Sequence, residues 1–219
     1  MRAQRWYLFA ALSGVVFAVL FLIGFVLEDA GSPGANASAT EVVEHYADSG
    51  TELKGEIGAT LIGFSVFFFL PYLGSLRSVL GRAEGEGGAF ASAAHAGGVA
   101  MISLIGASAA LQTAVASTEG FYETYEVDAN TALLISTIAL WMLGFAMVGG
   151  AVLVGGASLV AWKTGALPRW LAIGGFVAAA LGFFGESTAA FGIPVMLVTA
   201  WVLVSSVVLT RRQVTASRA

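Results

Sequence analysis

The chain has 219 residues, of which 58% are hydrophobic and only 11% are charged, and its formal net charge is -4. Soluble domains average about 25% charged residues, so this composition excludes an ordinary soluble domain and predicts an integral membrane protein. The chain has no cysteine and no basic patch, which excludes iron–sulfur clusters, thiolate zinc sites and nucleic-acid binding. We expect no cofactor and no metal site.

The first predicted span covers residues 7–27, an apolar run that begins after Trp6 and ends before Glu28. Basic residues precede this run and small residues follow it at 35–39, as in a secretory signal with its cleavage site. The run is longer than the ~7–15 residues of a signal peptide, and the small residues lie well beyond its end. We therefore expect an uncleaved span, with cleavage as the alternative.

Residues 28–55 are the one stretch long enough to form a polar element outside the membrane. Ser38 and Glu41 have the spacing of a capping box, and the apolar residues within 42–46 then share one side of a helix. We expect a short amphipathic helix here that rests on the membrane surface or caps the bundle.

Five further apolar runs predict the remaining spans, at about 56–78, 91–116, 131–160, 168–186 and 193–211. Pro71 should kink the second span in its final third, because proline removes a backbone donor. The fourth span exceeds the hydrocarbon thickness at ~1.5 Å per residue, so we expect it to tilt, kink or project. Asp128 or Asn130 is expected to cap its N-terminus.

Lysine and arginine gather on one side of the predicted spans. Nine of the ten lie there: Arg2, Arg5, Arg77, Arg82, Lys163, Arg169, Arg211, Arg212 and Arg218. The other side carries Lys54 alone, together with twelve of the fourteen acidic residues. Because cytoplasmic loops carry the excess of basic residues, we predict a cell-membrane protein with both termini cytoplasmic and an acidic outer face.

Small residues spaced four apart, which favour close helix contact in lipid, occur in several predicted spans. They are Ala10/Gly14/Ala18, Gly55/Ala59/Gly63, Ala146/Gly150 and Gly174/Ala178/Gly182. We expect these stripes to face neighbouring helices. The last span has no glycine after Gly192 and is rich in valine and leucine, so it is expected to be the most lipid-exposed helix.

Glu186 is the one ionisable residue between 170 and 210. If its helix continues the preceding small-residue stripe, the carboxylate points into the bundle, where it could relay protons or bind a cation. The alternative is an interfacial glutamate solvated at a turn. Glu56, Glu119 and Gln112 are expected at the same depth and could form a ligand or ion site with Glu186, or they could each be solvated separately.

His95 lies inside the third predicted span, near its cytoplasmic side. A lone intramembrane histidine can shuttle protons or bind a lipid head group, and the alternative is a hydrogen bond to a neighbouring helix. His45 is predicted on the opposite side of the membrane, which argues against a bis-histidine haem or a zinc site that uses both. The chain contains no GxSxG, HExxH or glycine-rich phosphate-loop motif.

Three stretches carry a family resemblance: TEVVEHYADSGTELKGEIGATLIGF at 40–64, FFFLPYLGSLRSVLGRAEG at 67–85 and TGALPRWLAIGG at 164–175. In these stretches the chain resembles small polytopic membrane proteins of high-GC actinobacteria, for which no chemistry is assigned. The resemblance implies a multi-span membrane protein and no particular activity or ligand.

The sequence as a whole predicts an all-α bundle of six transmembrane helices. The leading functional hypothesis is a non-enzymatic accessory, scaffold or binding component that works through its intramembrane surface and outer cap. Its expected partners are membrane lipid and another membrane protein or a second copy of the chain. A small transporter that uses Glu56, Glu119 and Glu186 is the alternative, and a lipid-active membrane enzyme is the third hypothesis.

Overall fold

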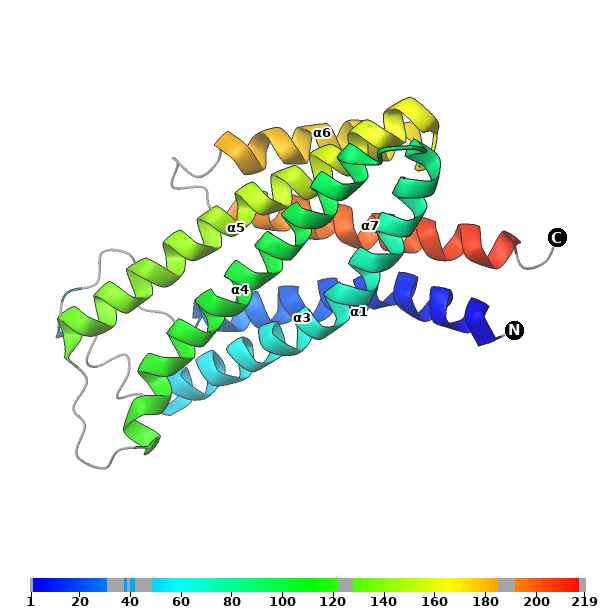
Figure 1. Cartoon of the computed structure of the whole chain (residues 1–219). Helices are drawn as coiled ribbons and strands as arrows, with labels where there is room; N and C mark the ends of the chain where they lie inside the picture. The colour runs from blue at the N-terminus through cyan, green and yellow to red at the C-terminus, as the bar shows by residue number, and fades with distance from the viewer. Residues whose placement is uncertain are drawn as a thin grey trace.

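The computed structural model describes residues 2–30, 38, 40–41, 49–121, 128–184 and 192–216, with some side chains at helix ends left out. This part of the chain contains no strand and forms an all-α bundle, as predicted (Figure 1). Its helices are α1 (Arg2–Ala30), α3 (Ser49–Glu84), α4 (Ala89–Phe121), α5 (Ala129–Thr164), α6 (Arg169–Phe184) and α7 (Gly192–Ala216).

Five of the described helices contain a stretch long and apolar enough to cross a membrane. These stretches are Leu8–Glu28, Leu53–Glu84, Ala89–Ala114, Ala129–Thr164 and Gly192–Arg212. Helix α6 is also apolar but has 16 residues, about 24 Å at ~1.5 Å per residue, which is shorter than the ~30 Å hydrocarbon core. Helix α3 begins at Ser49, ahead of the predicted start at 56, so the last part of the predicted outer loop is helical.

The helices form a ring. Each helix packs beside the next one in the chain, and α7 returns to pack on α1. Figure 1 shows both termini, the α3–α4 turn and the α5–α6 turn at one end of this ring. We call it the basic end, because Arg77, Arg82, Lys163, Arg169, Arg211 and Arg212 belong to the helix segments that meet there, and we call the opposite end the acidic end.

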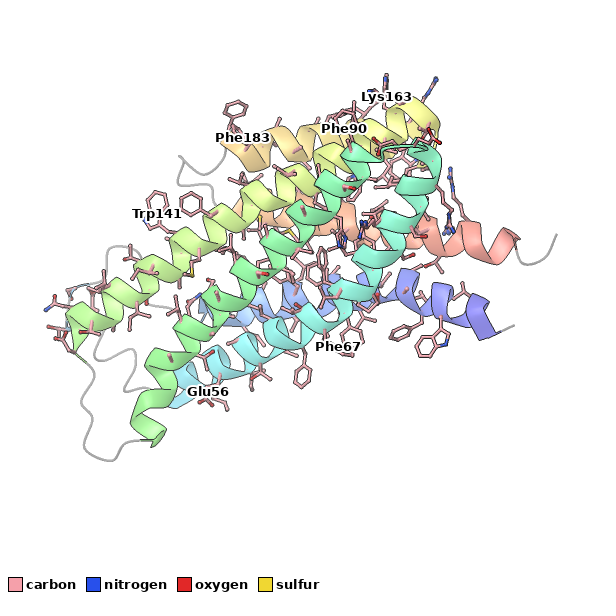
Figure 2. The ribbon with its side chains drawn as sticks, viewed as in Figure 1. Glu56, Phe67, Phe90, Trp141, Lys163 and Phe183 are labelled. Atoms are coloured by element: carbon pink, nitrogen blue, oxygen red, sulfur yellow. The ribbon has the colours of Figure 1, made fainter. Side chains whose placement is uncertain are left out.

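The long helices α4 and α5 are tilted relative to α1 and α7, as their oblique course in Figure 1 shows. Helix α5 has 36 residues, about 54 Å at ~1.5 Å per residue, so tilt brings more of it within the membrane. Helix α3 runs unbroken through Pro71. Figure 2 shows α3 changing direction beyond Phe67, in the part of the helix that contains this proline.

Two turns at the basic end are held by specific hydrogen bonds. The Glu84 carboxylate accepts from the backbone N–H groups of Phe90 (3.0 Å) and Ala91 (2.8 Å), and so caps the first turn of α4. Gly165 ends α5 in the left-handed conformation, with φ at 72°. The guanidinium of Arg212, from α7, donates to backbone carbonyls of this α5–α6 turn.

Two predicted caps at the acidic end are confirmed. Ser38 N–H donates to the Glu41 carboxylate (2.7 Å) and Glu41 N–H donates to Ser38 Oγ (3.3 Å), the reciprocal bonds of a capping box. Asp128 caps α5 by accepting from the hydroxyl (2.7 Å) and N–H (2.9 Å) of Thr131. These hydrogen bonds hold the pKa of both carboxyls below its ordinary value. The predicted amphipathic helix at 42–48 lies outside the described residues.

Glycine allows the backbones of two helix pairs to touch. A Cβ on Gly24 of α1 would lie 2.7 Å from the carbonyl oxygen of Gly58 in α3. Between α4 and α5, a Cβ on Gly97 would lie 2.7 Å from the carbonyl oxygen of Gly149, and one on Gly149 would lie 2.8 Å from that of Gly97. Such distances are shorter than any real Cβ contact, so these sites require glycine.

The structure buries most members of the predicted small-residue stripes and leaves two of them exposed. Ala59, Ala178 and Gly182 are buried, as are Gly14, Ala18, Ala146 and Gly150. Gly55 is partly buried. Gly63 and Gly174 are exposed and a Cβ there would meet nothing within 4 Å, so the prediction that these two pack inside the bundle is wrong. The closest approaches on these two helices are instead at Gly58 on α3 and Gly175 on α6.

The expectation that the last span is the most lipid-exposed is also wrong. In its apolar stretch, half of α7 is buried inside the bundle, against 39% for α1 and for α3. The face of α7 that packs inside the bundle carries polar and aromatic side chains: Thr199, Trp201, Ser205 and Ser206 are all buried. The Trp201 indole N–H donates to the Leu171 carbonyl of α6 (3.1 Å).

We predict that Gly97→Ala destabilises the bundle, because its methyl group would meet the backbone of α5 at van der Waals overlap. The expected loss is about 1–3 kcal/mol, as for overpacking of a tight core. Gly106→Ala in the same helix is the control, since its Cβ would have only Val66 Cγ2 nearby, at 3.9 Å. Unfolding of both variants in detergent micelles measures the difference. Equal stability of the two variants would contradict the close contact.

Candidate functional site

The carboxylate cluster predicted at the acidic end is only partly covered by the described residues. Glu56 lies near the start of α3, partly exposed, and Figure 2 shows it at the acidic end. Gln112 lies partly buried on α4. Glu119 belongs to the last turns of α4, but its side chain, like the whole of Glu186, lies outside the described residues. A site formed by these four residues therefore stays a prediction.

The structure points to a carboxylate that the sequence analysis treated only as the end of a span. Glu28, on α1, is 8% exposed, and it is the one charged residue classed as buried among the described side chains. Its backbone lies against α3, where a Cβ on Gly58 would be 2.7 Å from Glu28 N. The signal in the sequence was the glycine at 58, two residues beyond Glu56, because it permits this approach.

His95 lies on α4, in the half nearer the basic end, and its side chain is partly buried. Its Nδ1 is buried and has no hydrogen-bond partner among the described residues. The proton-relay and head-group roles of His95 stay predictions. Within the described chain no three His, Asp or Glu side chains lie close enough together to hold a metal ion.

A buried polar seam joins α1, α3 and α7. The hydroxyl of Tyr72, a completely buried side chain of α3, lies 2.6 Å from Ser205 Oγ of α7. The neighbouring Ser206 donates to the Ala11 carbonyl of α1. The Tyr72 ring packs on Gly14 of α1, where a Cβ would lie 2.6 Å from the ring. The seam uses its polar groups to join helices, which leaves them unavailable to a ligand.

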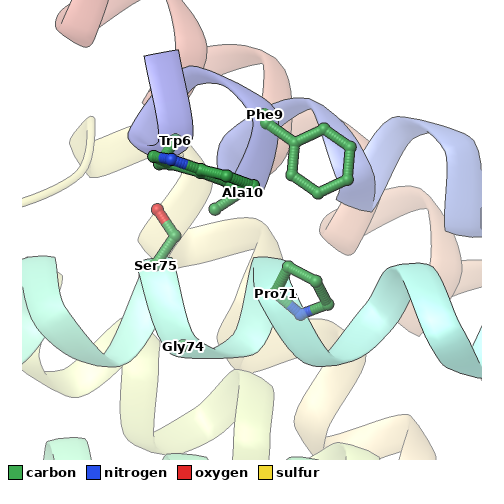
Figure 3. Close-up of a pocket in the computed structure, with 6 residues that line it drawn as sticks. All are labelled: Trp6, Phe9, Ala10, Pro71, Gly74 and Ser75. Carbon is green, nitrogen blue, oxygen red and sulfur yellow. The ribbon is translucent and has the colours of Figure 1, made fainter. Parts of the chain in front are cut away.

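An apolar groove opens on the outside of the bundle next to this seam. It has a volume of about 400 Å³ and lies between α1 and α3, lined by Trp6, Phe9, Ala10, Pro71, Gly74 and Ser75 (Figure 3). Sequence analysis singled out Pro71 for its kink but did not predict the groove. A groove needs the two helices to diverge, and the pattern of apolar residues on each helix does not report their separation.

The Ser75 hydroxyl is the buried polar side-chain group of this groove. Ser75 is 5% exposed, and its Oγ has no hydrogen-bond partner among the described residues. Other buried serines in these helices, such as Ser13 and Ser65, donate to a carbonyl of their own helix at 2.8 and 2.6 Å. Figure 3 shows the Ser75 oxygen directed from α3 toward the Trp6 ring of α1. Ser75 is therefore a buried donor without a partner in the described chain, at the edge of the groove.

We predict that Tyr72→Phe weakens the bundle by about 0.5–1.5 kcal/mol, because it removes one interhelical hydrogen bond and keeps the ring. Ser205 retains its bond to a carbonyl of its own helix, Val202 O at 3.0 Å. A double-mutant cycle with Ser205→Ala, followed by unfolding in micelles, checks the pair. The loss of unfolding free energy in the double variant should be smaller than the sum of the losses in the two single variants. Additive losses would show that the hydroxyls do not interact.

No protein-family model matches this chain. No curated protein and no solved structure matches it either. Its function is therefore inferred from its own residues and their geometry.

Proposed function

We propose that this chain is a six-span protein of the cell membrane with both termini in the cytoplasm. Its apolar helices indicate an integral membrane protein. The short helix α6 starts at the basic end and runs alongside α5 toward the acidic end (Figure 1), and two termini at one end require an even number of crossings. A helix shorter than the hydrocarbon core can cross where the bilayer thins locally, so the length of α6 is compatible with its being the fifth of six crossings.

The charge distribution supports the proposed orientation. Every described basic side chain except Lys54 lies at the end that holds both termini, and cytoplasmic segments carry the excess of Lys and Arg. The same end carries exposed tryptophans beside cations: the Arg169 guanidinium lies 6.0 Å from the ring centroid of Trp162. Aromatic residues of this kind mark the membrane interface.

We propose further that the protein is a non-enzymatic binding or accessory component that acts through its intramembrane surface. The observation that carries this role is the contrast between its interior and its exterior. Several buried polar groups of the described helices join one helix to another, as in Tyr72 with Ser205 and Ser108 with the Ala139 carbonyl (2.8 Å). Large side chains such as Phe67, Trp141 and Phe183 instead point outward (Figure 2).

A small transporter is the second candidate, because Glu28 is a buried carboxylate at the acidic end. A buried intramembrane carboxylate is a common element of cation and proton pathways. This candidate requires that the purified chain alone carries cations or protons across a membrane. The accessory role requires instead a bound partner.

The absence of cysteine makes the orientation directly testable. We expect Asn130→Cys, exposed at the acidic end, to react with a membrane-impermeant maleimide on intact cells. Glu86→Cys, exposed in the α3–α4 turn at the basic end, should react only after the membrane is permeabilised. The two variants serve as controls for each other. The reverse pattern would place the termini outside.

For the accessory role, we predict that the full chain purified from its native membrane in mild detergent retains a membrane protein partner or a second copy of itself at fixed stoichiometry. Native mass spectrometry of the complex measures this. A monomer without any protein partner that drives a pH-dependent flux in liposomes, lost in Glu28→Gln, would overturn the accessory role and favour the transporter.

A further inference from the structure

We propose that the groove between α1 and α3 binds one acyl chain of a glycerophospholipid from the surrounding bilayer, with an ester carbonyl of that lipid accepting a hydrogen bond from Ser75 Oγ. This inference rests on the proposed membrane-spanning role and names a ligand for the intramembrane surface. Three observations carry it: the position of the groove along the helix axis, its chemistry and its continuity with the lipid-facing surface.

The groove lies at the depth where the glycerol esters of a bilayer meet the acyl chains. Arg77, exposed on α3, marks the polar boundary at the basic end. At ~1.5 Å per residue, Ser75 lies about 3 Å from Arg77 along the axis and Pro71 about 9 Å from it. The hydroxyl is thus at the level of the interface, and the apolar floor extends from there toward the hydrocarbon core.

The chemistry of the groove fits an acyl chain that has one hydrogen-bond acceptor at its end. Its walls are the rings of Trp6 and Phe9, and its floor is formed by Pro71 and Gly74 (Figure 3). An ordered water needs about two to four polar partners, whereas Ser75 Oγ is the one buried unpartnered polar side-chain atom among the described lining residues. A carbonyl-bearing hydrocarbon satisfies the buried donor and fills the apolar space at the same time.

The groove is continuous with the surface that faces lipid. Trp6 at its rim is 71% exposed, and Phe67 and Leu70 on the adjoining part of α3 are 66% and 49% exposed. A volume of about 400 Å³ corresponds to roughly one turn of a helix ~10 Å wide, which is too little to seat a transmembrane helix of a partner. A slender acyl chain, by contrast, enters such a groove directly from the bilayer.

The test uses the full chain in nanodiscs of phosphatidylcholine and phosphatidylglycerol that contain a phosphatidylcholine with a photoreactive diazirine on one acyl chain. After irradiation, mass spectrometry locates the lipid adducts. We expect adducts at Trp6 and Phe9 to exceed those at Trp141 and Phe183, exposed aromatic residues on other helices.

Two pairs of variants separate the groove from general lipid contact. Gly74→Leu fills the groove and should lower adducts at Trp6 and Phe9 about tenfold, since one excess methylene in an apolar pocket already costs about 10–200-fold. Gly63→Leu is its control, because both glycines are exposed on α3 and have nothing within 4 Å of a built Cβ. Ser75→Ala should reduce the labelling about two- to tenfold, the effect of one hydrogen bond. Ser65→Ala, whose hydroxyl bonds within its own helix, should leave the labelling unchanged.

Labelling of Trp141 and Phe183 with no excess at the groove would overturn the lipid site while leaving the membrane-spanning role intact. Unchanged labelling in Gly74→Leu, or capture of a second protein chain at Trp6 in place of lipid, would overturn it as well. An absence of adducts at all four aromatic residues would instead contradict membrane insertion itself and with it the proposed function.

Discussion

The distance between neighbouring helices in this bundle is set where backbone meets backbone. Gly24 against Gly58 joins α1 to α3, and Gly97 against Gly149 joins α4 to α5. Between apolar helices in lipid there is no hydrophobic driving force, so association depends on close packing and on interhelical hydrogen bonds. Side chains elsewhere on these helices adopt their positions around the two contacts. These two contacts fix the spacing of two helix pairs, and the packing of α7 on α1 closes the ring.

Hydroxyl groups supply the second kind of contact. Tyr72, Ser108, Ser205 and Ser206 each reach a different helix, and an unpaired hydroxyl in hydrocarbon would cost free energy that these bonds avoid. Ser75 and Ser158 are also buried yet have no partner in the described chain, and of these two Ser75 lines the groove. The same residue type thus joins helices at some positions and is left without a partner at others.

Much of this fold was predictable because its strongest signals are local or compositional. Long uncharged runs predict helices in a bilayer, the Ser38 and Glu41 spacing predicts a capping box, and Asp128 before an apolar run predicts an N-cap. The positions of arginine and lysine predict which turns lie together at one end of the ring. None of these inferences needs knowledge of which helix lies beside which.

The sequence was a weaker guide wherever the answer depended on a partner helix. Gly63 and Gly174 have the right spacing for packing but lie on the wrong edge, and their neighbours Gly58 and Gly175 make the contacts. Glu28 looks like the polar end of a span until α3 is placed against it. The groove at Ser75 exists only because of the separation between α1 and α3. Such features arise from the relative position of two helices, which a periodic pattern on each one does not encode.

The return of α7 to α1 has a consequence for biosynthesis. The Ser206–Ala11 hydrogen bond joins residues 195 positions apart, so α1 can complete its contacts only after α7 has been synthesised. Before α7 packs, the Tyr72 hydroxyl lacks its Ser205 partner, because that serine lies on α7. The guanidinium of Arg212 then joins α7 to the α5–α6 turn by hydrogen bonds. The ring therefore closes only once α7 has been made, and a translation product truncated before α7 exposes its unfilled polar seam to lipid and to quality control.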